Sequence, residues 1–249
     1  PGQTERTMKD ILKTTVTLGG RTVGTIQMTP KRDRCVFEYD RDWIANGFSI
    51  SPWELPLQTG LIFSKENSFG DGFAAFEDSL PDGYGLYLLD RMLRSEGSSL
   101  AELSPLQRLS LVGSSGMGAL CYRPEVRATP MNTITDGDFD ELQSKALDVL
   151  SEKSDADASL LYYRSNNSGG ARPKAIFKAS DGTDWLVKFR HTYDPSDIGR
   201  MEYLYMSTAQ KCGIVIPEIR LINERYFAIK RFDIRDGKRI HTLTAAALL

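Results

Sequence analysis

Apolar and polar residues alternate along the first part of the chain, between Lys9 and Phe37. The alternation is clearest over Thr15–Leu18 and Thr22–Ile26, on either side of the pair Gly19-Gly20. Two alternating runs joined by a glycine pair are typical of a β-hairpin. A further strand is predicted over Arg34–Tyr39, after the charged turn at residues 31–33. The chain is therefore expected to open with a small antiparallel sheet.

Helical spacing of apolar residues replaces this alternation further on. The pattern predicts helices over Leu86–Leu93, Ser104–Leu111 and Phe139–Leu150, a strand over Gly118–Tyr122, and a connector from Pro124 through Thr135. The polar run Ser151–Asp157 reads as a linker.

The last part of the chain shows a second sheet pattern around a glycine-rich loop at residues 165–172. Strands are predicted over Leu160–Tyr163, Lys174–Lys178, Trp185–Phe189, Glu218–Ile222 and Tyr226–Arg231, with turns at Asp181-Gly182 and Asn223-Glu224. Ser196 is a suitable N-cap for a helix that runs through Lys211 and ends at Gly213.

Together these elements predict an α+β protein in three consecutive parts. Residues 9–125 form an antiparallel, β-rich subdomain, residues 126–157 a connector with one helix, and residues 158–249 an antiparallel sheet with a helix. The last part has the layout of a kinase amino-terminal lobe.

Composition narrows the class of protein. Of the 249 residues, 41% are hydrophobic and 26% charged, which is ordinary for a packed globular chain and excludes a disordered one. The formal net charge of -2 offers no overall positive field, so direct nucleic-acid binding is not expected. No apolar run approaches the roughly 20 residues of a membrane span, and the first residues lack an apolar leader.

Cysteine and histidine usage excludes two further site types. Cys35, Cys121 and Cys212 are far apart and form no CxxC pair, so the cytoplasm is the expected location and no disulfide framework is predicted. His191 and His241 have no metal-ligand spacing around them, and no metal site is predicted within this chain.

Three features in sequence order carry the candidate chemistry. They are the glycine-rich loop from Ser168 to Lys174, the strand lysine Lys188, and Glu202 early in the following helix. Glycines let backbone amides approach phosphate oxygens, a strand lysine neutralises phosphate charge, and the glutamate orients that lysine. Together the three features describe a kinase amino-terminal lobe, and because the loop lacks the GKS or GKT of a P-loop, a P-loop NTPase is disfavoured.

With these residues, the sequence resembles the HipA family of bacterial serine/threonine kinases along nearly its whole length. The motif Leu80-Pro81-Asp82-Gly83 is similar to the family's amino-terminal motif, and residues 112–120 resemble its glycine-alanine strand. Gly169–Lys174 and Lys230–Asp233 are similar to its phosphate loop and hinge.

The resemblance implies an ATP- and Mg²⁺-dependent kinase that acts as the toxin of a toxin–antitoxin pair. Its implied partners are a HipB-like DNA-binding antitoxin and a protein substrate, which is an aminoacyl-tRNA synthetase for the best-known relatives. It assigns ATP binding to Ser168, Gly169, Gly170, Ala171, Arg172, Lys174 and Lys188, pairs Glu202 with Lys188, and places Lys230 and Phe232 against adenine. Autophosphorylation is expected near Asn167, at Ser165 or Ser168.

One departure from the kinase pattern concerns catalysis. Phosphoryl transfer needs an aspartate base and magnesium ligands from a carboxy-terminal lobe, and only 18 residues follow Arg231. The chain is therefore predicted to be the amino-terminal portion of a HipA-like kinase, inactive alone for lack of that lobe. The alternative is a non-enzymatic module that docks an antitoxin or a separate catalytic subunit.

Overall fold

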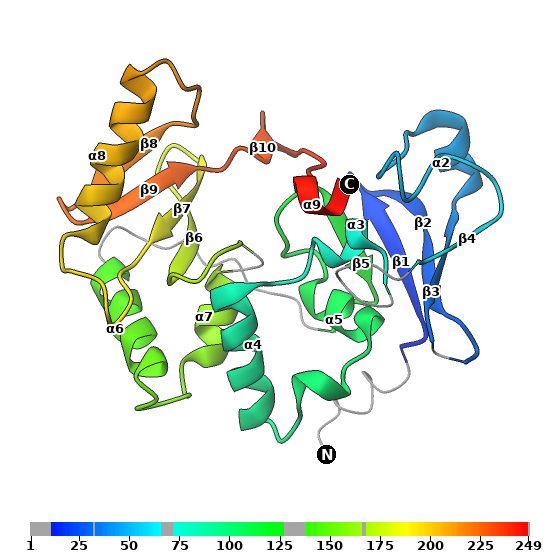
Figure 1. Ribbon diagram of the computed structural model, residues 1–249, viewed down its shortest axis with the longest axis horizontal. Helices are drawn as coiled ribbons and strands as arrows, with labels where there is room; N and C mark the ends of the chain where they lie inside the picture. The colour runs from blue at the N-terminus through cyan, green and yellow to red at the C-terminus, as the bar shows by residue number, and fades with distance from the viewer. Residues whose placement is uncertain (1–10, 32, 66–71, 127–137, 166–167, 249) are drawn as a thin grey trace. The chain divides into compact units, whose positions relative to one another are not determined.

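The computed structural model describes residues 11–31, 33–65, 72–126, 138–165 and 168–248 (Figure 1). The chain forms two compact units. The first comprises the described parts of residues 1–80, 101–129 and 235–249, and the second those of 81–100 and 130–234. Both units combine helices with antiparallel sheets, so the α+β class is confirmed.

The first unit is built on a five-stranded antiparallel sheet of order β4-β3-β2-β1-β5. Its strands are β1 (Lys13–Leu18), β2 (Arg21–Met28), β3 (Cys35–Tyr39), β4 (Leu61–Phe63) and β5 (Leu120–Arg123). Its helices are α2 (Arg41–Asn46), α3 (Ala74–Glu77), α5 (Pro105–Val112) and α9 (Ala245–Leu248). The hairpin around Gly19-Gly20 and the strands near 35–39 and 120–123 are confirmed.

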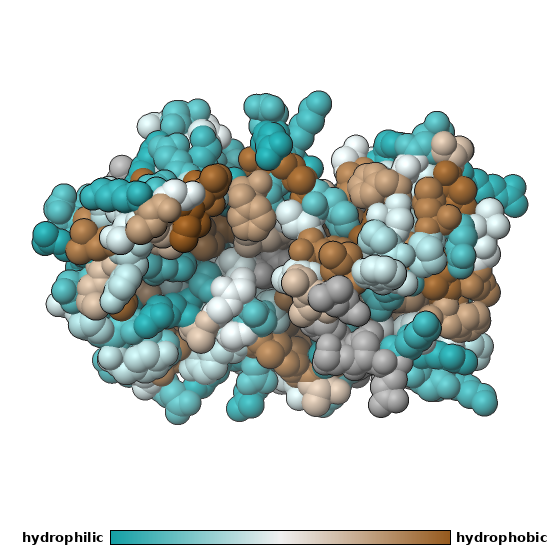
Figure 2. All heavy atoms as spheres, turned by 45° about the horizontal axis from the view of Figure 1, so that its top comes forward, coloured by the Kyte–Doolittle hydropathy of each residue, from teal (hydrophilic) through white to brown (hydrophobic). Residues whose placement is uncertain are grey.

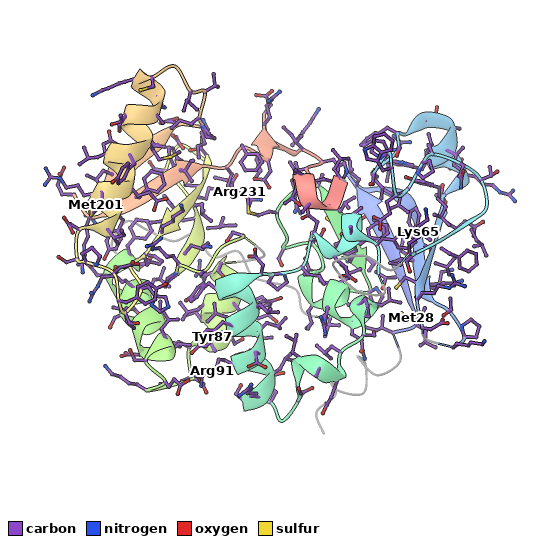
Figure 3. All side chains as sticks on the ribbon, viewed as in Figure 1. Met28, Lys65, Tyr87, Arg91, Met201 and Arg231 are labelled. Carbon is purple, nitrogen blue, oxygen red and sulfur yellow. The ribbon has the colours of Figure 1, made fainter. Side chains whose placement is uncertain are left out.

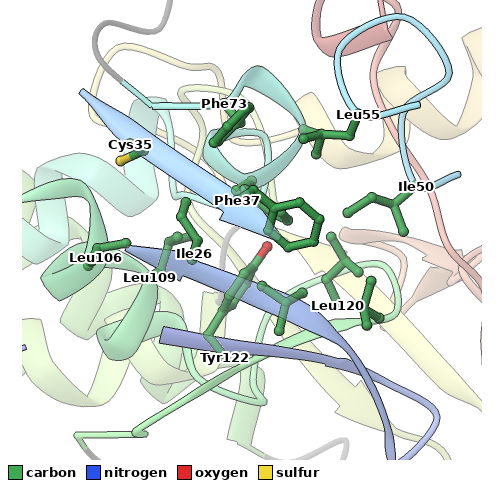
Figure 4. Close-up of a cluster of buried hydrophobic side chains, with 14 of the residues drawn as sticks. Ile26, Cys35, Phe37, Ile50, Leu55, Phe73, Leu106, Leu109, Leu120 and Tyr122 are labelled. Carbon is green, nitrogen blue, oxygen red and sulfur yellow. The ribbon is translucent and has the colours of Figure 1, made fainter. Parts of the chain in front are cut away.

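Aliphatic and aromatic side chains together form the core of this unit (Figure 4). The ring of Phe37 lies 4.8 Å from that of Tyr39 and 5.1 Å from that of Phe76, both between centroids. Tyr122 is fully buried, and its hydroxyl shares a 2.6 Å hydrogen bond with that of Ser79. The alternation seen in the sequence is explained by this core, which takes every second residue of the strands.

Within its described residues, the second unit contains a four-stranded antiparallel sheet of order β6-β7-β9-β8 and four helices. Its elements are α4 (Gly83–Ser95), α6 (Phe139–Leu150), α7 (Ala158–Ser165), β6 (Lys174–Lys178), β7 (Asp184–Lys188), α8 (Ile198–Lys211), β8 (Ile219–Ile222) and β9 (Tyr226–Lys230). The structure also describes a 3-10 turn at Leu100–Glu102 and a small ladder of β10 (Ile234–Arg235) and β11 (Lys238–Arg239).

The two faces of this sheet have different roles. Phe177 and Tyr226 lie on one face, where their rings are 5.1 and 5.8 Å from that of Phe139 in α6. Lys174 lies on the other face, because it is three positions before Phe177 on the same strand. Lys188 shares the face of Lys174, because the two residues are cross-strand partners. One face is thus an apolar core and the other carries charge.

The predicted strand at Leu160–Tyr163 is wrong, since these residues belong to helix α7. Four consecutive apolar residues fit either a buried strand or a helix. The buried positions Ala158, Leu161, Tyr162 and Ser165 follow helical spacing and decide for the helix. The N-cap of α8 is Asp197 and not Ser196.

Helix α4 packs with α7 in the second unit. The hydroxyl of Tyr87 donates to the carbonyl of Val149 (2.9 Å), and Arg91 forms ion pairs with Glu152 (2.6 Å) and Asp155 (3.2 Å; Figure 3). The units are therefore discontinuous, unlike the three consecutive parts predicted. Local periodicity shows that α4 is a helix but contains no information on which segment it packs against.

Residues 235–248 belong to the first unit because polar contacts join them to segments that are distant in the sequence. The guanidinium of Arg239 donates to the carbonyls of Ser114 (2.7 Å), Gly118 (2.5 Å) and Gly116. Thr244 bonds both carboxylate oxygens of Asp78, through its amide (2.8 Å) and its hydroxyl (2.7 Å). The last described segment is thus fastened to the amino-terminal sheet unit by polar contacts.

On the face shown in Figure 2, hydrophobic residues lie in separate patches among hydrophilic ones. Across the described ranges, no helix combines the length and apolar content needed to cross a membrane.

We expect Arg239→Ala to lower the free energy of unfolding of the first unit by about 1–3 kcal/mol, because three carbonyls lose a charged donor. Urea unfolding measures this change. Arg235→Ala, an exposed arginine of the same segment, is the matched control and should have little effect. Equal urea midpoints for Arg239→Ala and Arg235→Ala would show that the Arg239 hydrogen bonds do not stabilise the first unit.

Candidate nucleotide-binding site

Two lysines face each other on adjacent strands of the second sheet. Lys174 of β6 and Lys188 of β7 are direct cross-strand partners in the antiparallel register. Like charges placed directly opposite each other repel and destabilise a sheet. Burial lowers the pKa of Lys174 to about 8, and the positive charge of Lys188 contributes in the same direction. An unfavourable pair of this kind is typical of a site that takes an anion.

Lys188 is held by a carboxylate from the following helix. Its ammonium hydrogen-bonds to Oε1 of Glu202 in α8, and it lies 5.4 Å from the ring centroid of Phe227. The side chains of Lys188 and Glu202 remain 31% and 26% exposed, so the pair is accessible to a ligand. The structure thus brings together the two residues that the sequence predicted as catalytic.

The glycine-rich loop closes around the other lysine. The ammonium of Lys174 donates to the carbonyls of Ser168 (3.4 Å), Gly169 and Gly170 (2.9 Å), and the residue is only 3% exposed. The loop carbonyls therefore point toward this ammonium. Ala171, also predicted to bind ATP, is exposed on the same loop.

The beginning of helix α4 fastens the loop at Gly170. The amide of Gly170 donates to Oδ1 of Asp82 (2.9 Å), and the amide of Tyr84 donates to the carbonyl of Gly170 (3.1 Å). Gly83 has a φ of +41°, and a Cβ there would lie 2.7 Å from the carbonyl carbon of Gly170. The loop and the helix approach so closely that only glycine fits at position 83.

Asp82 is therefore a site residue that sequence reasoning missed. Its partner lies 88 positions away, so no local spacing could reveal it. The signal that the sequence did contain was the Leu80-Pro81-Asp82-Gly83 motif itself.

Arg172 fastens the far end of the loop. Its Nε and Nη2 donate to the two carboxylate oxygens of Asp194, at 2.8 and 2.9 Å. The Asp194 side chain is 4% exposed and also accepts the amide of His191 (2.9 Å). The Arg172 guanidinium holds the pKa of this carboxyl below its usual range. Arg172 thus ties the loop to the segment that leads into α8 and Glu202.

Lys230 ends β9 on the face opposite the lysine pair, and Phe232 follows two positions later. Lys230 is paired with Trp185, on the opposite face of the sheet from Lys188, and its ammonium is 3.7 Å from Glu218. Phe232 is 62% exposed. Between them, Arg231 and Asp233 form a buried ion pair through two hydrogen bonds of 2.9 and 2.6 Å, which fixes the chain after β9.

The two serines predicted as phosphorylation sites are buried. Ser165 is 1% exposed and donates to the carbonyl of Tyr162 (3.2 Å), while Ser168 is 3% exposed and donates to the carbonyl of Ser165 (2.6 Å). Asn167 lies outside the described residues. A kinase could reach either hydroxyl only after this segment rearranges.

Comparison with known proteins assigns the family. A family model described as HipA N-terminal domain matches residues 14–123, and one described as HipA-like C-terminal domain matches residues 167–249. The chain belongs to the HipA family. The second match shows that residues 167–249 correspond to the HipA-like C-terminal domain, the part of the chain in which the sequence predicted a kinase-like lobe.

A solved HipA structure has a similar fold. It is the toxin–antitoxin system of Shewanella oneidensis MR-1, described as a complex of HipA, HipB and its operator DNA. The TM-score is 0.59 at 19% identity, over 91% of this chain and 53% of the other. The chain thus spans about half the length of that relative. No curated protein matches the sequence.

Among the described residues, no group of three or more His, Cys, Asp or Glu side chains is arranged to hold a metal ion. The residues assembled here fit the phosphates of a nucleotide, and no magnesium ligand is assigned to them.

We expect Asp194→Asn to weaken the attachment of the glycine loop, because Arg172 loses a charged partner and keeps one neutral acceptor. The expected loss of stability is about 1 kcal/mol, since Arg172 is 45% exposed and solvent screens the pair. Amide hydrogen exchange in peptides covering residues 168–172 should be faster in this variant than in Asp184→Asn, which alters a carboxylate at the opposite end of the hairpin. Equal exchange rates would contradict the anchoring role.

Proposed function

We propose that this HipA-family chain binds ATP and contributes the nucleotide site of a serine/threonine kinase, the toxin of a toxin–antitoxin pair. The observation that carries the proposal is the pair Lys174–Lys188 beneath the glycine loop, with Lys188 held by Glu202. A polyphosphate between the ammoniums would relieve their repulsion. ATP supplies this negative charge, and the lysines orient it.

The same face of the sheet offers an apolar surface for the base. Ile176 and Leu186 share the face of Lys174 and Lys188, because strand residues two positions apart point the same way. We propose that adenine lies against them, close to the backbone of residues 230–232. The backbone amides of Lys230 and Arg231 already donate to the backbone carbonyls of Glu218 (2.8 Å) and Asp184 (2.9 Å). Phe232 is therefore the residue proposed to contact the base.

Binding, and not turnover by this chain alone, is the activity proposed. The residues described here supply phosphate and base contacts, whereas phosphoryl transfer also needs a catalytic base and Mg²⁺ ligands. The protein substrate remains a prediction from the family resemblance, an aminoacyl-tRNA synthetase being the example, as does the cytoplasmic location.

A HipB-like antitoxin is the partner that we propose. Support comes from the solved relative, which is described in complex with HipB and operator DNA. We propose that contact with DNA is made through that partner, because the net charge of -2 gives this chain no general attraction for phosphate backbones.

Lys188→Ala should weaken ATP binding at least tenfold, because it removes one of two charges that meet the phosphates. Isothermal titration calorimetry with Mg²⁺-ATP measures the dissociation constant. The control is Lys178→Ala, which alters the exposed lysine at the other end of β6, paired with Asp184 at 2.9 Å. If Lys188→Ala binds like the wild type, or the wild type binds no ATP, the docking module becomes the favoured function.

The affinity for ATP should fall as the pH rises from 7.5 to 9. Burial lowers the pKa of Lys174 to about 8, so this residue loses its positive charge over that window. Each pH unit above the pKa then weakens binding by up to about tenfold, until the higher pKa of the complex is reached. Lys174→Met should bind weakly and without this dependence. A wild-type affinity that is constant from pH 7.5 to 9 would exclude a charged Lys174 as a phosphate ligand.

A further inference from the structure

The carboxylate of Asp82 stands in an unusual place for a residue that begins a helix. Asp82 is the N-cap of the 13-residue helix α4, a position where an aspartate usually accepts an amide of its own helix. Within the described part of the chain, its side chain makes no such capping bond. Oδ1 accepts instead the amide of Gly170, at the centre of the glycine loop.

This contact gives a loop amide the partner that a phosphate would otherwise provide. Amides of glycine-rich loops bind phosphate oxygens because they are unpaired donors. Here the amide of Gly170 already donates to an anionic oxygen at 2.9 Å. The other oxygen of Asp82 lies 3.4 Å from the position of a Cβ built on Gly169, so the carboxylate covers two consecutive loop residues.

The carboxylate also interacts with the charges of the proposed phosphate site. The negative charges of Asp82 and Glu202 both raise the pKa of Lys174, opposing the effects of burial and of Lys188. Two carboxylates thus face the two lysines. Glu202 orients Lys188 by direct contact, whereas Asp82 contacts the loop and neither ammonium in the hydrogen bonds described.

We propose that Asp82 is an internal anion that competes with nucleotide phosphates for the glycine loop. This inference rests on the proposed function, because it concerns the regulation of that same site. The carboxylate holds the loop against α4 when no nucleotide is bound, and its charge opposes the approach of a polyphosphate. Binding then breaks the Asp82–Gly170 bond and transfers the amide to a phosphate oxygen.

The close fit at Gly83 supports a defined contact. The amide of Tyr84 and the carboxylate of Asp82 bond the carbonyl and the amide of the same residue, Gly170. Two hydrogen bonds to one peptide residue define its orientation as well as its position. The loop is therefore fixed by α4 in one arrangement, from which a ligand has to release it.

The decisive variant is Asp82→Asn, which keeps the shape and an acceptor oxygen but removes the charge. The proposal predicts that this variant binds ATP more tightly than the wild type, on the order of tenfold at low salt, with a smaller gain at 0.5 M salt. Adenosine, which has no phosphates, should bind both proteins equally. Asp90→Asn is the control, since Asp90 is on the same helix and pairs with Arg94 at 2.9 Å.

A second measurement examines the contact without any nucleotide. Hydrogen–deuterium exchange of loop peptides covering residues 168–172 should be slowest in the wild type, faster in Asp82→Asn and fastest in Asp82→Ala. This order follows because a charged acceptor binds an amide more strongly than a neutral one. Equal exchange in the three proteins would overturn the proposal, because it would show that the Asp82 carboxylate does not hold the Gly170 amide.

The outcomes separate this proposal from the proposed function. If wild-type binding of ATP depends on Lys188 but Asp82→Asn binds no more tightly, the competition is refuted and the nucleotide site stands. If neither the wild type nor Asp82→Asn binds ATP, both fail. Tighter binding of ATP with unchanged binding of adenosine and ordered exchange rates would support the competition.

Discussion

The repulsion between Lys174 and Lys188 is the constraint on which the second unit's site depends. An antiparallel register places the two ammoniums on one face of adjacent strands, and burial further destabilises the charged form of Lys174. Nearby polar groups offset both unfavourable effects. Glu202 pairs with Lys188, and three loop carbonyls surround the ammonium of Lys174. Each of these compensating groups also shapes the site.

The conformation of the loop follows from the same constraint. Carbonyls drawn toward Lys174 leave the amide of Gly170 facing outward, where Asp82 accepts it. Arg172 and Asp194 then hold the end of the loop close to the segment that carries Glu202 into place. Loop, strand lysines and helix α8 thus form one connected set of polar contacts.

Sequence reasoning predicted the local elements well because they are set by short-range patterns. The hairpin at Gly19-Gly20 and the strands with Lys174 and Lys188 follow from alternation and turn residues. The pair Lys188–Glu202 was predicted through the order of kinase-like features and is formed. The helix at residues 158–165 was missed, since a run of four apolar residues fits two periodicities.

The parts that were not predicted depend on long-range packing. The partner of Asp82 is 88 residues away, and Arg239 reaches carbonyls more than 115 positions earlier in the chain. The face on which Lys230 lies follows from the pairing register of β7 and β9, which the sequence leaves open. Long-range pairing of this kind also explains why the compact units are discontinuous.

A crystal structure of this chain with a non-hydrolysable ATP analogue tests the role of the two lysines most directly. Phosphate oxygens are expected within hydrogen-bond distance of both Lys174 and Lys188, with the base on the face of Ile176 and Leu186. An analogue bound elsewhere, or phosphates that contact neither lysine, would contradict that role.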